Sequence, residues 1–516
     1  MCGIAAIIDF ASSWDGRHVN GHDHQAELLT MLEKFRYRGD PELFGEVLVD
    51  DGFALGTNRL AIVDRHHAKQ PITDKAGQVV VVFNGEIYNH SELREELKQQ
   101  GWEFQTESDT EVLVNGYLHW GNDLANKLDG IYAFIVADKV NNSFLAVRDH
   151  VGIKPLYYAV KHEVHYFASE QKSLIHLGVS IATVAPGTFI RDGNTYTYFD
   201  LEGQPSAVVQ NLPNVDESIR ECRRLLENAV RKQVQTDLPM AVMFSAGIDS
   251  SIILNMACKY HPNVTAITIG FDGAADMPIA ERYCKERGIR HLTYRLDRDE
   301  LVGMIPHVVY VAEFFEGIDI IDACVAYFGY RHARRNGFKV ALCGEGSDEV
   351  LAGYDLFRSH SDPQSLMRYR VHNLHRTDLQ RVDRASMMNS VEARVPFLDK
   401  EFLSFAYNLP MNMKLRSGVE KWVLREAFRD VLPDYLIDRP KVRMPEGSGV
   451  KNILMEYAAT QSPRIDEGLR GQLKLDTPQS MYFYSLFSEQ GFPIPTGRHR
   501  LPGLDYSENG YFKFAS

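Results

Sequence analysis

The second residue of the chain is a cysteine that could become an amino-terminal nucleophile. The sequence begins MCGIAAIIDF, so removal of Met1 would leave Cys2 with both a thiol and a free α-amine. Because an α-amine has a pKa of about 7.7–8.0, part of it is unprotonated near neutral pH and can act as the general base for its own thiol. The alternative is a stray cysteine at a fraying terminus, and the letters MCG alone would favour that alternative.

Further segments of the first 200 residues supply groups that could bind and hydrolyse glutamine. Arg59 in TNRLAIVD offers a cation for an α-carboxylate, and Asp109 in TESDTEV offers an anion for an α-ammonium. Asn84 and Gly85 in FNGEIYN offer a side-chain amide and a backbone N–H for a tetrahedral oxyanion, and Glu86 could complete the pocket. Each has an ordinary alternative: a surface ion pair for Arg59, a hairpin turn for Asn84 and Gly85, and a helix cap for Asp109.

These segments occur in the order of a known family. The series MCGI, NRLAIVD, FNGEIYN, SDTEV, GIYAF, RDHVGIKPLYY and FASEQKSL resembles the glutaminase domain of class II glutamine amidotransferases. The resemblance implies the four-layer αββα sandwich of amino-terminal-nucleophile hydrolases, an α+β fold that agrees with the many short strands of this region. It implies glutamine binding by Arg59, Asn84, Glu86 and Asp109. The family usually reads R-G-P-D where this chain has R-G-D-P at 38–41, so one wall of the glutamine pocket is expected to differ.

The second half of the chain contains two loops that could bind phosphates. The apolar strand MAVMF leads through SAGIDSS into a helix, and backbone N–H groups at such a turn bind anions. A later loop, CGEGSDE, gathers Glu345, Asp348 and Glu349, whose charges repel unless cations lie among them. Asp249 and Asp348 together suit Mg²⁺-pyrophosphate, although Asp249 could merely cap its helix. Lys441, just after a proline, is placed to neutralise a leaving pyrophosphate.

Strands alternate with helices in this half, which predicts an α/β domain with a parallel sheet and both loops at its carboxyl edge. Its segments resemble the ATP-pyrophosphatase domain of glutamine-hydrolysing asparagine synthetases. The likeness implies a ligase in which ATP activates a carboxylic acid as an acyl-adenylate, ammonia from glutamine attacks it, and AMP and pyrophosphate leave. It implies that Glu345 deprotonates the attacking ammonia and that Lys441 binds pyrophosphate. The implied ATP site consists of Met243, Ser245, Gly247, Asp249, Ser250, Ile269, Gly344 and Glu345, with Asp249 and Asp348 holding the metal.

The acceptor acid is expected to be aspartate, because most proteins of this architecture make asparagine, but one region departs from the family. Asparagine synthetases often carry T-T-I-R before the second loop, where this chain reads I-D-I-I at 318–321. An arginine there would suit a second carboxylate, whereas Asp319 and Asp322 add negative charge. An acid that bears an amine or an apolar body is therefore the alternative acceptor, unless another cation such as Arg384 takes over.

Other functions fit the motifs less well. Amidotransferases that make phosphoribosylamine or glucosamine phosphate share the first half, but SAGIDSS and GEGSDE count against both. β-Lactam-forming relatives typically lack the amino-terminal cysteine and the glutamate of the second loop, and this chain has both. A non-enzymatic scaffold would need lesions at the same positions, and the sequence shows none.

Composition sets the remaining expectations. The 516 residues carry a net charge of −13, which argues against nucleic-acid and anionic-membrane partners and leaves small-molecule substrates. The 6 cysteines have no CxxC spacing, which is typical of reduced cytoplasmic thiols, and no leader or membrane-spanning run is found. We expect a glutaminase domain at 2–200, a polar linker at 201–215, a synthetase domain at 216–516, and a homodimer.

Overall fold

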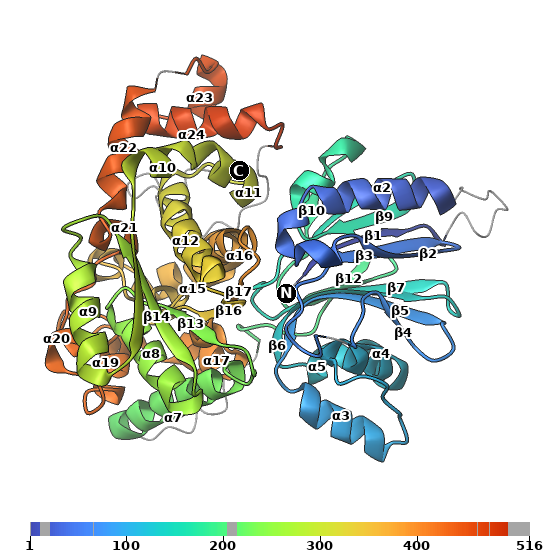
Figure 1. The fold of residues 1–516 in the computed structure, drawn as a ribbon, viewed down its shortest axis with the longest axis horizontal. Coiled ribbons are helices and arrows are strands. Elements are labelled where there is room, and N and C mark those ends of the chain that lie inside the picture. The colour runs from blue at the N-terminus through green and yellow to red at the C-terminus, as the bar shows by residue number, and fades with distance from the viewer. Residues whose placement is uncertain are drawn as a thin grey trace. The chain divides into compact units, whose positions relative to one another are not determined.

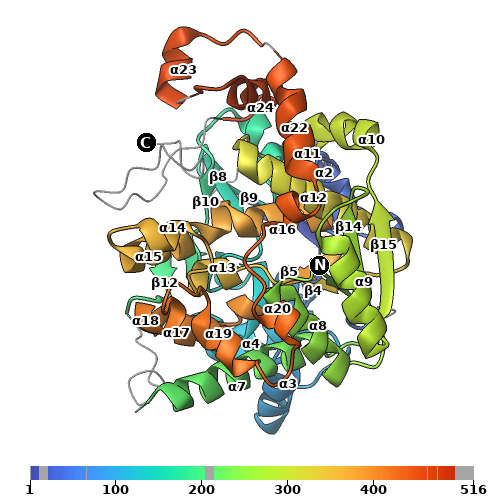
Figure 2. The same ribbon diagram turned by 90° about the vertical axis from the view of Figure 1, so that its left-hand side faces the viewer.

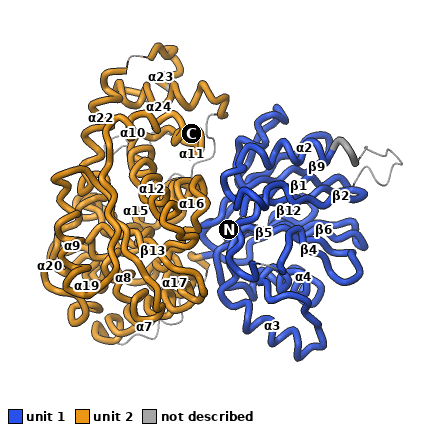
Figure 3. Tube along the Cα trace, viewed as in Figure 1, with its two compact units in different colours: residues 1–200 blue, residues 201–516 orange. Residues whose placement is uncertain are grey.

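The computed structural model describes residues 2–10, 21–65, 67–203, 214–461, 463–473 and 475–493. The chain divides into two compact units, residues 1–200 and 201–516 (Figure 3). Most of the expected linker, residues 204–213, lies outside the described residues. In the part of the chain that is described, no helix combines the length and the apolar character needed to cross a membrane.

Two antiparallel sheets form the body of the first unit, each six-stranded within the described residues (Figure 1). One sheet has the order β10 (Ala182–Thr183), β8 (Tyr157–Lys161), β9 (Val164–Ala168), β1 (Gly3–Ile8), β3 (Phe53–Asn58) and β2 (Glu46–Asp50). The other has the order β12 (Asn194–Thr197), β11 (Thr188–Arg191), β7 (Ser143–Arg148), β6 (Gly130–Asp138), β5 (Val79–Ile87) and β4 (Ile72–Thr73). The helices of this unit are α2 (Gly21–Glu33), α3 (His90–Gln99), α4 (Asp109–Trp120) and α5 (Leu124–Lys127).

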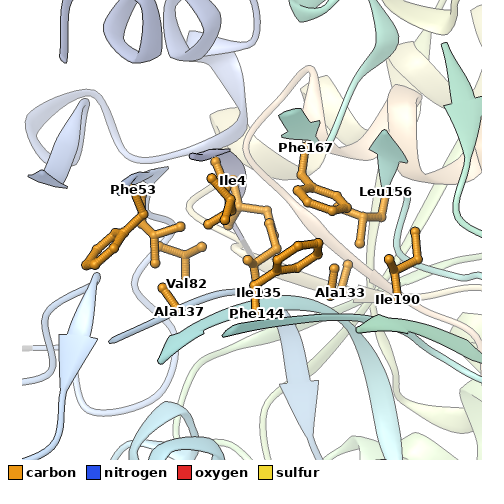
Figure 4. Close-up of a cluster of buried hydrophobic side chains, with 14 of the residues drawn as sticks. Ile4, Phe53, Val82, Ala133, Ile135, Ala137, Phe144, Leu156, Phe167 and Ile190 are labelled. Atoms are coloured by element: carbon orange, nitrogen blue, oxygen red, sulfur yellow. The ribbon is translucent and has the colours of Figure 1, made fainter. Parts of the chain in front are cut away.

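The two faces of β1 explain its uninterrupted apolar sequence. Because strand side chains alternate, Ile4 and Ile8 point between the sheets, where they join Val82 and Ile135 in one core cluster (Figure 4). Ala5 and Ile7 point the other way, into a second cluster with Leu28 and Met31 of α2. Helix α4 packs on β5 of the second sheet. The layers are therefore helix, sheet, sheet and helix, and the predicted αββα sandwich is confirmed.

The second unit is built on a parallel sheet, five-stranded within the described residues, in the order β15, β14, β13, β16 and β17. Its strands are β13 (Met240–Met243), β14 (Val264–Gly270), β15 (Arg290–Arg295), β16 (Val340–Leu342) and β17 (Glu392–Arg394). Helices α8 (Ile248–Tyr260), α9 (Asp276–Arg287) and α12 (Gly317–Arg335) pack against it, and Figure 2 shows α9 beside β14 and β15. The chain runs outward from β13 to β15, and β16 then starts on the other side of β13. The switch point of this confirmed α/β fold thus lies between β13 and β16, where ligands of such sheets bind.

The described residues of the second unit form further α-helices. They are α7 (Val215–Gln233), α10 (Arg298–Gly303), α11 (Ile305–Ala312), α13 (Ser347–Val350), α14 (Leu356–Ser359), α15 (Pro363–Asn373), α16 (Asp378–Met387), α17 (Lys400–Asn408), α18 (Met411–Lys414), α19 (Trp422–Ala427), α20 (Asp434–Ile437), α21 (Met444–Gly447), α22 (Val450–Thr460), α23 (Glu467–Leu473) and α24 (Pro478–Glu489).

Lys414, at the end of α18, is a fully buried amine with little polar compensation. Its Nζ lies 2.7 Å from Met367 Sδ and donates to the carbonyl oxygen of Tyr407 at 3.3 Å. Among the described residues no carboxylate forms an ion pair with it. Burial, and to a lesser extent the charge of Arg368, hold the pKa of Lys414 well below its ordinary value.

We expect Lys414→Met to stabilise the protein by about 1–3 kcal/mol at neutral pH, since it removes a poorly compensated buried polar group. In the unfolded chain Lys414 is protonated below about pH 10.4, whereas burial disfavours its protonated form in the folded protein. The free energy by which Lys414 destabilises the protein therefore falls as the pH rises towards that value. Thermal unfolding of both proteins at about pH 7 and about pH 10 tests this. Lys285→Met, which changes an exposed lysine, serves as the control. An unchanged or lower melting temperature for Lys414→Met would contradict the prediction.

Candidate active sites

The amino-terminal cysteine lies where the two sheets of the first unit meet. Cys2 directly precedes β1 and is only 4% exposed. Its backbone N–H donates to Asn84 Oδ1 at 3.0 Å, so the first sheet and strand β5 of the second are joined at this residue. If Met1 is removed, the same nitrogen becomes the α-amine. The structure therefore places the candidate nucleophile and its candidate base beside the candidate oxyanion residue.

Asn84 and Gly85 belong to a strand and not to a hairpin turn. β5 runs through both residues and pairs them with Ala133 and Tyr132 of β6. Asn84 is fully buried, its Oδ1 accepts from Cys2, and its Nδ2 finds no hydrogen-bond partner among the described residues. A buried amide donor without a partner costs free energy that a bound oxygen would recover. At Gly85, a Cβ would lie 2.1 Å from the carbonyl oxygen of Ile131, so no side chain fits there.

The residues expected to bind glutamine lie near the ends of the same strands. Arg59 follows β3, whose Asn58 pairs with Gly3 of β1, and it is 6% exposed, which rules out the surface ion pair. Its guanidinium donates to the carbonyl oxygens of Val63 at 3.4 Å and Asp64 at 3.2 Å.

The two acidic residues expected in the glutamine pocket, Glu86 and Asp109, come from β5 and α4. Asp109 accepts from the backbone N–H of Ile87 at 3.2 Å, which ties the start of α4 to the end of β5. Ser108, not Asp109, caps this helix through its hydroxyl. Glu86 is buried within β5.

The unusual order R-G-D-P supports the segment that carries Arg59. Asp40 accepts from the backbone N–H of Ala61 at 3.0 Å, and its own N–H donates to the carbonyl oxygen of Arg59 at 2.8 Å. Pro41 begins a short 3₁₀ helix, Pro41–Leu43. Asp40 therefore holds the backbone on both sides of Leu60.

A buried ion pair, which the sequence analysis did not identify, holds the carbonyl of Cys2. Arg38 Nε donates to this carbonyl at 3.2 Å, and Arg38 Nη1 lies 2.7 Å from Glu170 Oε1, with both side chains fully buried. Glu170 also contacts Tyr37 and Lys172. The sequence signal for this pair was the polar segment FASEQKSL after an otherwise apolar strand.

In the second unit, a cavity opens at the switch point between β13 and β16. The sequence-predicted residues that line it are Met243, Ser245, Gly247, Asp249, Ser250, Ile269, Gly344, Glu345, Asp348 and Lys441. The structure thus brings every expected ATP, metal and base residue of this half to one cavity. Its wall also includes residues that the sequence analysis did not identify, among them Arg381, Lys421, Arg439 and Arg443.

The cavity has an apolar end and a polar end. Met243 and Ile269 lie at the ends of β13 and β14, facing Gly329 of α12, where a Cβ would be 3.2 Å from Met243 Sδ. The small-residue loop then turns into α8, and the hydroxyl groups of Ser245 and Ser250 lie 3.2 Å apart at its start. An apolar slot beside the N-terminus of a long helix suits a base followed by phosphates.

Lysines separate the carboxylates of the two loops. Lys421 Nζ lies 2.6 Å from both Asp249 Oδ2 and Asp348 Oδ1, and Lys441 contacts Asp348 and lies 3.9 Å from Asp249. Burial alone would raise the pKa of Asp348, but the charges of Lys421 and Lys441 hold it well below its ordinary value. The like charges of this loop are therefore balanced by protein cations.

Arg381 of α16 joins the carboxylates on the other side of the cavity. Its guanidinium lies 3.4 Å from Asp319, 3.2 Å from Asp322 and 2.8 Å from Asp378, and it also contacts Glu345. Burial raises the pKa of Glu345 to about 8, against the opposing charge of Arg381.

The suggestion that Arg384 serves as the acceptor cation is wrong. Arg384 is fully buried between Glu313 at 2.8 Å and Asp383 at 3.0 Å and does not line the cavity. Residues three apart are neighbours on a helix surface, so the two arginines are distinguished by their partners: Arg381 lines the cavity, whereas Arg384 is held by Glu313 and Asp383. The sequence alone could not say which of the two arginines meets the cavity.

Asp249 and Asp348 fit a magnesium site that is completed by substrate. Within the described residues no three His, Cys, Asp or Glu side chains are arranged to hold a metal ion by themselves. Mg²⁺ is usually bound by one or two carboxylates together with substrate phosphates, and these two acids at the start of α8 and α13 match that donor set.

Comparisons with known proteins cover almost the whole chain. The family described as Glutamine amidotransferase domain matches residues 1–212, and the family described as Asparagine synthase matches residues 221–364 and 356–482. The glutamine-hydrolyzing asparagine synthetase B of Escherichia coli (strain K12) is 32% identical over 530 residues, 98% of this chain and 93% of that protein. The glutamine-hydrolyzing asparagine synthetase of Zea mays is 30% identical over 533 residues, 97% of this chain and 88% of that protein.

Proposed function

Because the chain belongs to the asparagine synthase family and carries a glutamine amidotransferase domain, we propose that it uses glutamine and ATP to convert aspartate into asparagine. The observation that carries this proposal is the gathering of the expected ATP, base and pyrophosphate residues in one cavity. The names of the relatives favour aspartate over another acid as the acceptor.

The first unit would hydrolyse glutamine through Cys2. The thiolate attacks the side-chain amide carbon, and the α-amine takes the thiol proton and returns it to the leaving ammonia. The free Nδ2 of Asn84 and the N–H of Gly85 donate to the oxyanion. Water then hydrolyses the thioester and glutamate leaves, while Arg59 and the acids Glu86 and Asp109 bind its α-carboxylate and α-ammonium.

The second unit would consume this ammonia. A carboxylate oxygen of aspartate attacks the α-phosphorus of ATP, pyrophosphate leaves, and ammonia displaces AMP from the acyl-adenylate. Glu345 accepts the proton that the attacking nitrogen loses. Met243 and Ile269 contact adenine, the Ser245–Ser250 loop binds phosphates, and Lys441 with Lys421 neutralises pyrophosphate. Mg²⁺ held by Asp249 and Asp348 would neutralise phosphate charge.

The role of Glu345 predicts a pH dependence that belongs to synthesis alone. A base must be unprotonated, so ammonia-dependent kcat/KM should rise with pH until the pKa of Glu345, about 8, has been passed. The measurement holds the concentration of unprotonated ammonia constant between about pH 6 and about pH 9. Glu345→Gln should lose this rise and about 10²–10⁴-fold of the rate. A wild-type profile that is flat over this range would contradict the assignment.

A screen of acceptor acids tests the function itself. Purified protein with glutamine, ATP and Mg²⁺ is offered aspartate, glutamate, β-alanine or no acid, and AMP, pyrophosphate and the amide are measured. We expect aspartate to give the highest kcat/KM and asparagine to form in step with AMP. A higher kcat/KM for another acid would overturn the choice of aspartate, and formation of ADP and orthophosphate would overturn the adenylate mechanism.

We further propose that residues 2–200 and 216–516 are the two catalytic domains, that 201–215 links them, and that the protein is a cytoplasmic homodimer. Sedimentation of the full chain measures the mass against 58.6 kDa for one copy. A single species of that mass would exclude the dimer.

A further inference from the structure

One carboxylate oxygen on the wall of the cavity in the second unit has no hydrogen-bond donor among the described residues. Asp322 of α12 lines the cavity and is only 4% exposed. Its Oδ2 accepts from Arg381 at 3.2 Å and from Arg443 at 2.7 Å, which fixes the orientation of the carboxylate. Its Oδ1 accepts no hydrogen bond from any described residue. Asp322 thus presents a fixed oxygen whose donor must come from whatever occupies the cavity.

The charges around Asp322 favour a cationic donor. The guanidinium of Arg381 is already shared by Asp319, Asp322, Glu345 and Asp378. Arg443 adds one more cation, and it is bound to Asp322 itself. Asparagine synthetases often carry an arginine at the position of Ile321. The side chain of Ile321 instead lines a separate, mainly apolar pocket. Four acids of this cluster share two arginines, Arg381 and Arg443, so a positive group would be bound here better than a carboxylate.

We propose that Oδ1 of Asp322 binds the α-ammonium group of the amino-acid acceptor. This inference rests on the proposed function, which supplies an acceptor with both a reacting carboxylate and an ammonium group. A hydrogen bond between two charged groups completes the bonding of Asp322. The same contact disfavours an acid that lacks the ammonium group, because such an acid would cover Asp322 Oδ1 without offering it a donor.

Aspartate and succinate differ only in this ammonium group, so their comparison isolates the contact. Ammonia-dependent pyrophosphate release gives kcat/KM for each acid, in wild-type protein and in Asp322→Asn. We expect wild type to have a higher kcat/KM for aspartate than for succinate. In the variant this ratio should fall by about 10- to 100-fold, which corresponds to the loss of one hydrogen bond between charged groups. KM for ATP and the thermal unfolding curve report on the fold of the second unit. Asp322→Ser is the second variant if the first does not fold.

Asp319→Asn is the matched control. Asp319 lies on the same helix and pairs with the same guanidinium at 3.4 Å, but it does not line the cavity. It should leave the ratio of aspartate to succinate unchanged. If Asp322→Asn slows both acids equally, or if Asp319→Asn lowers the preference as much, Asp322 only holds the arginines and the inference is wrong. If wild type activates no acid at all, the proposed function has failed instead.

Discussion

Cys2→Ala is expected to abolish glutamine hydrolysis, by at least about 10³-fold, while amide synthesis from ammonium salts continues at the wild-type rate. Alanine keeps the backbone contacts of residue 2 to Asn84 and Arg38, so the loss would come from the missing sulfur. In the proposed function, the second unit binds ATP and the acceptor acid with residues of its own cavity. Its chemistry would then need ammonia but not the source of ammonia.

The measurement compares glutamate release from glutamine with AMP formation from ammonium chloride, in the same preparation. Cys258→Ala is the control, because Cys258 is an exposed thiol in α8 of the second unit and should leave both activities intact. Mass spectrometry of the intact wild-type chain shows whether Met1 has been removed. Glutamine hydrolysis that survives Cys2→Ala would show that another group is the nucleophile.

The sequence predicted the elements of the fold well because its signals are local. β1 is apolar at every position, and the structure buries both of its faces. The alternation of strands and helices after residue 215 led directly to the parallel sheet, and the motif loops then had to meet at its carboxyl edge. What placed Met243, Asp249 and Glu345 in one cavity was therefore topology, which the alternation of elements predicts.

The partners of the charged residues could not be predicted in the same way. Lys421 is 172 residues from Asp249 in sequence, and no local pattern marks it as the cation between the two loops. Arg381 and Arg384 lie three residues apart in α16, whose residues are all buried, so no amphipathic pattern indicates which of the two lines the cavity. Glu170 is likewise joined to Arg38 only because β9 pairs with β1. Such contacts depend on tertiary packing.

The strand position of Asn84 and Gly85 shows how one pair of letters can mislead. Asn-Gly is the strongest short signal for a hairpin, yet here it lies within β5. The flanking residues VVVVF and EI continue the strand on both sides, and the close approach of Ile131 explains why glycine is needed. Strand pairing and close packing against β6, and not a turn, account for the glycine.

Asp249→Asn is expected to lower ATP-dependent amide synthesis by at least about 10²-fold and to leave glutamine hydrolysis unchanged. Asparagine keeps the shape of the side chain but removes one of the two carboxylates that would hold Mg²⁺ against the phosphates. It also leaves Lys421 with Asp348 as its remaining partner in this pair of acids. Lys421 would then still attract phosphate oxygens of bound ATP, but the metal that positions them for reaction would be missing.

The loss of charge has a second consequence that separates catalysis from folding. Breaking a buried ion pair costs about 3–5 kcal/mol when the remaining charge is left alone, but Lys421 keeps Asp348, so the unfolding temperature should fall only modestly. Asp299→Asn is the matched control, since Asp299 also lies in the first turn of a helix but is exposed. Pyrophosphate and AMP are measured for all three proteins over a range of Mg²⁺ concentrations. If Asp249→Asn kept the wild-type rate and the wild-type Mg²⁺ dependence, Asp249 would serve only as a structural partner of Lys421 and Ser347, and the metal site would lie elsewhere.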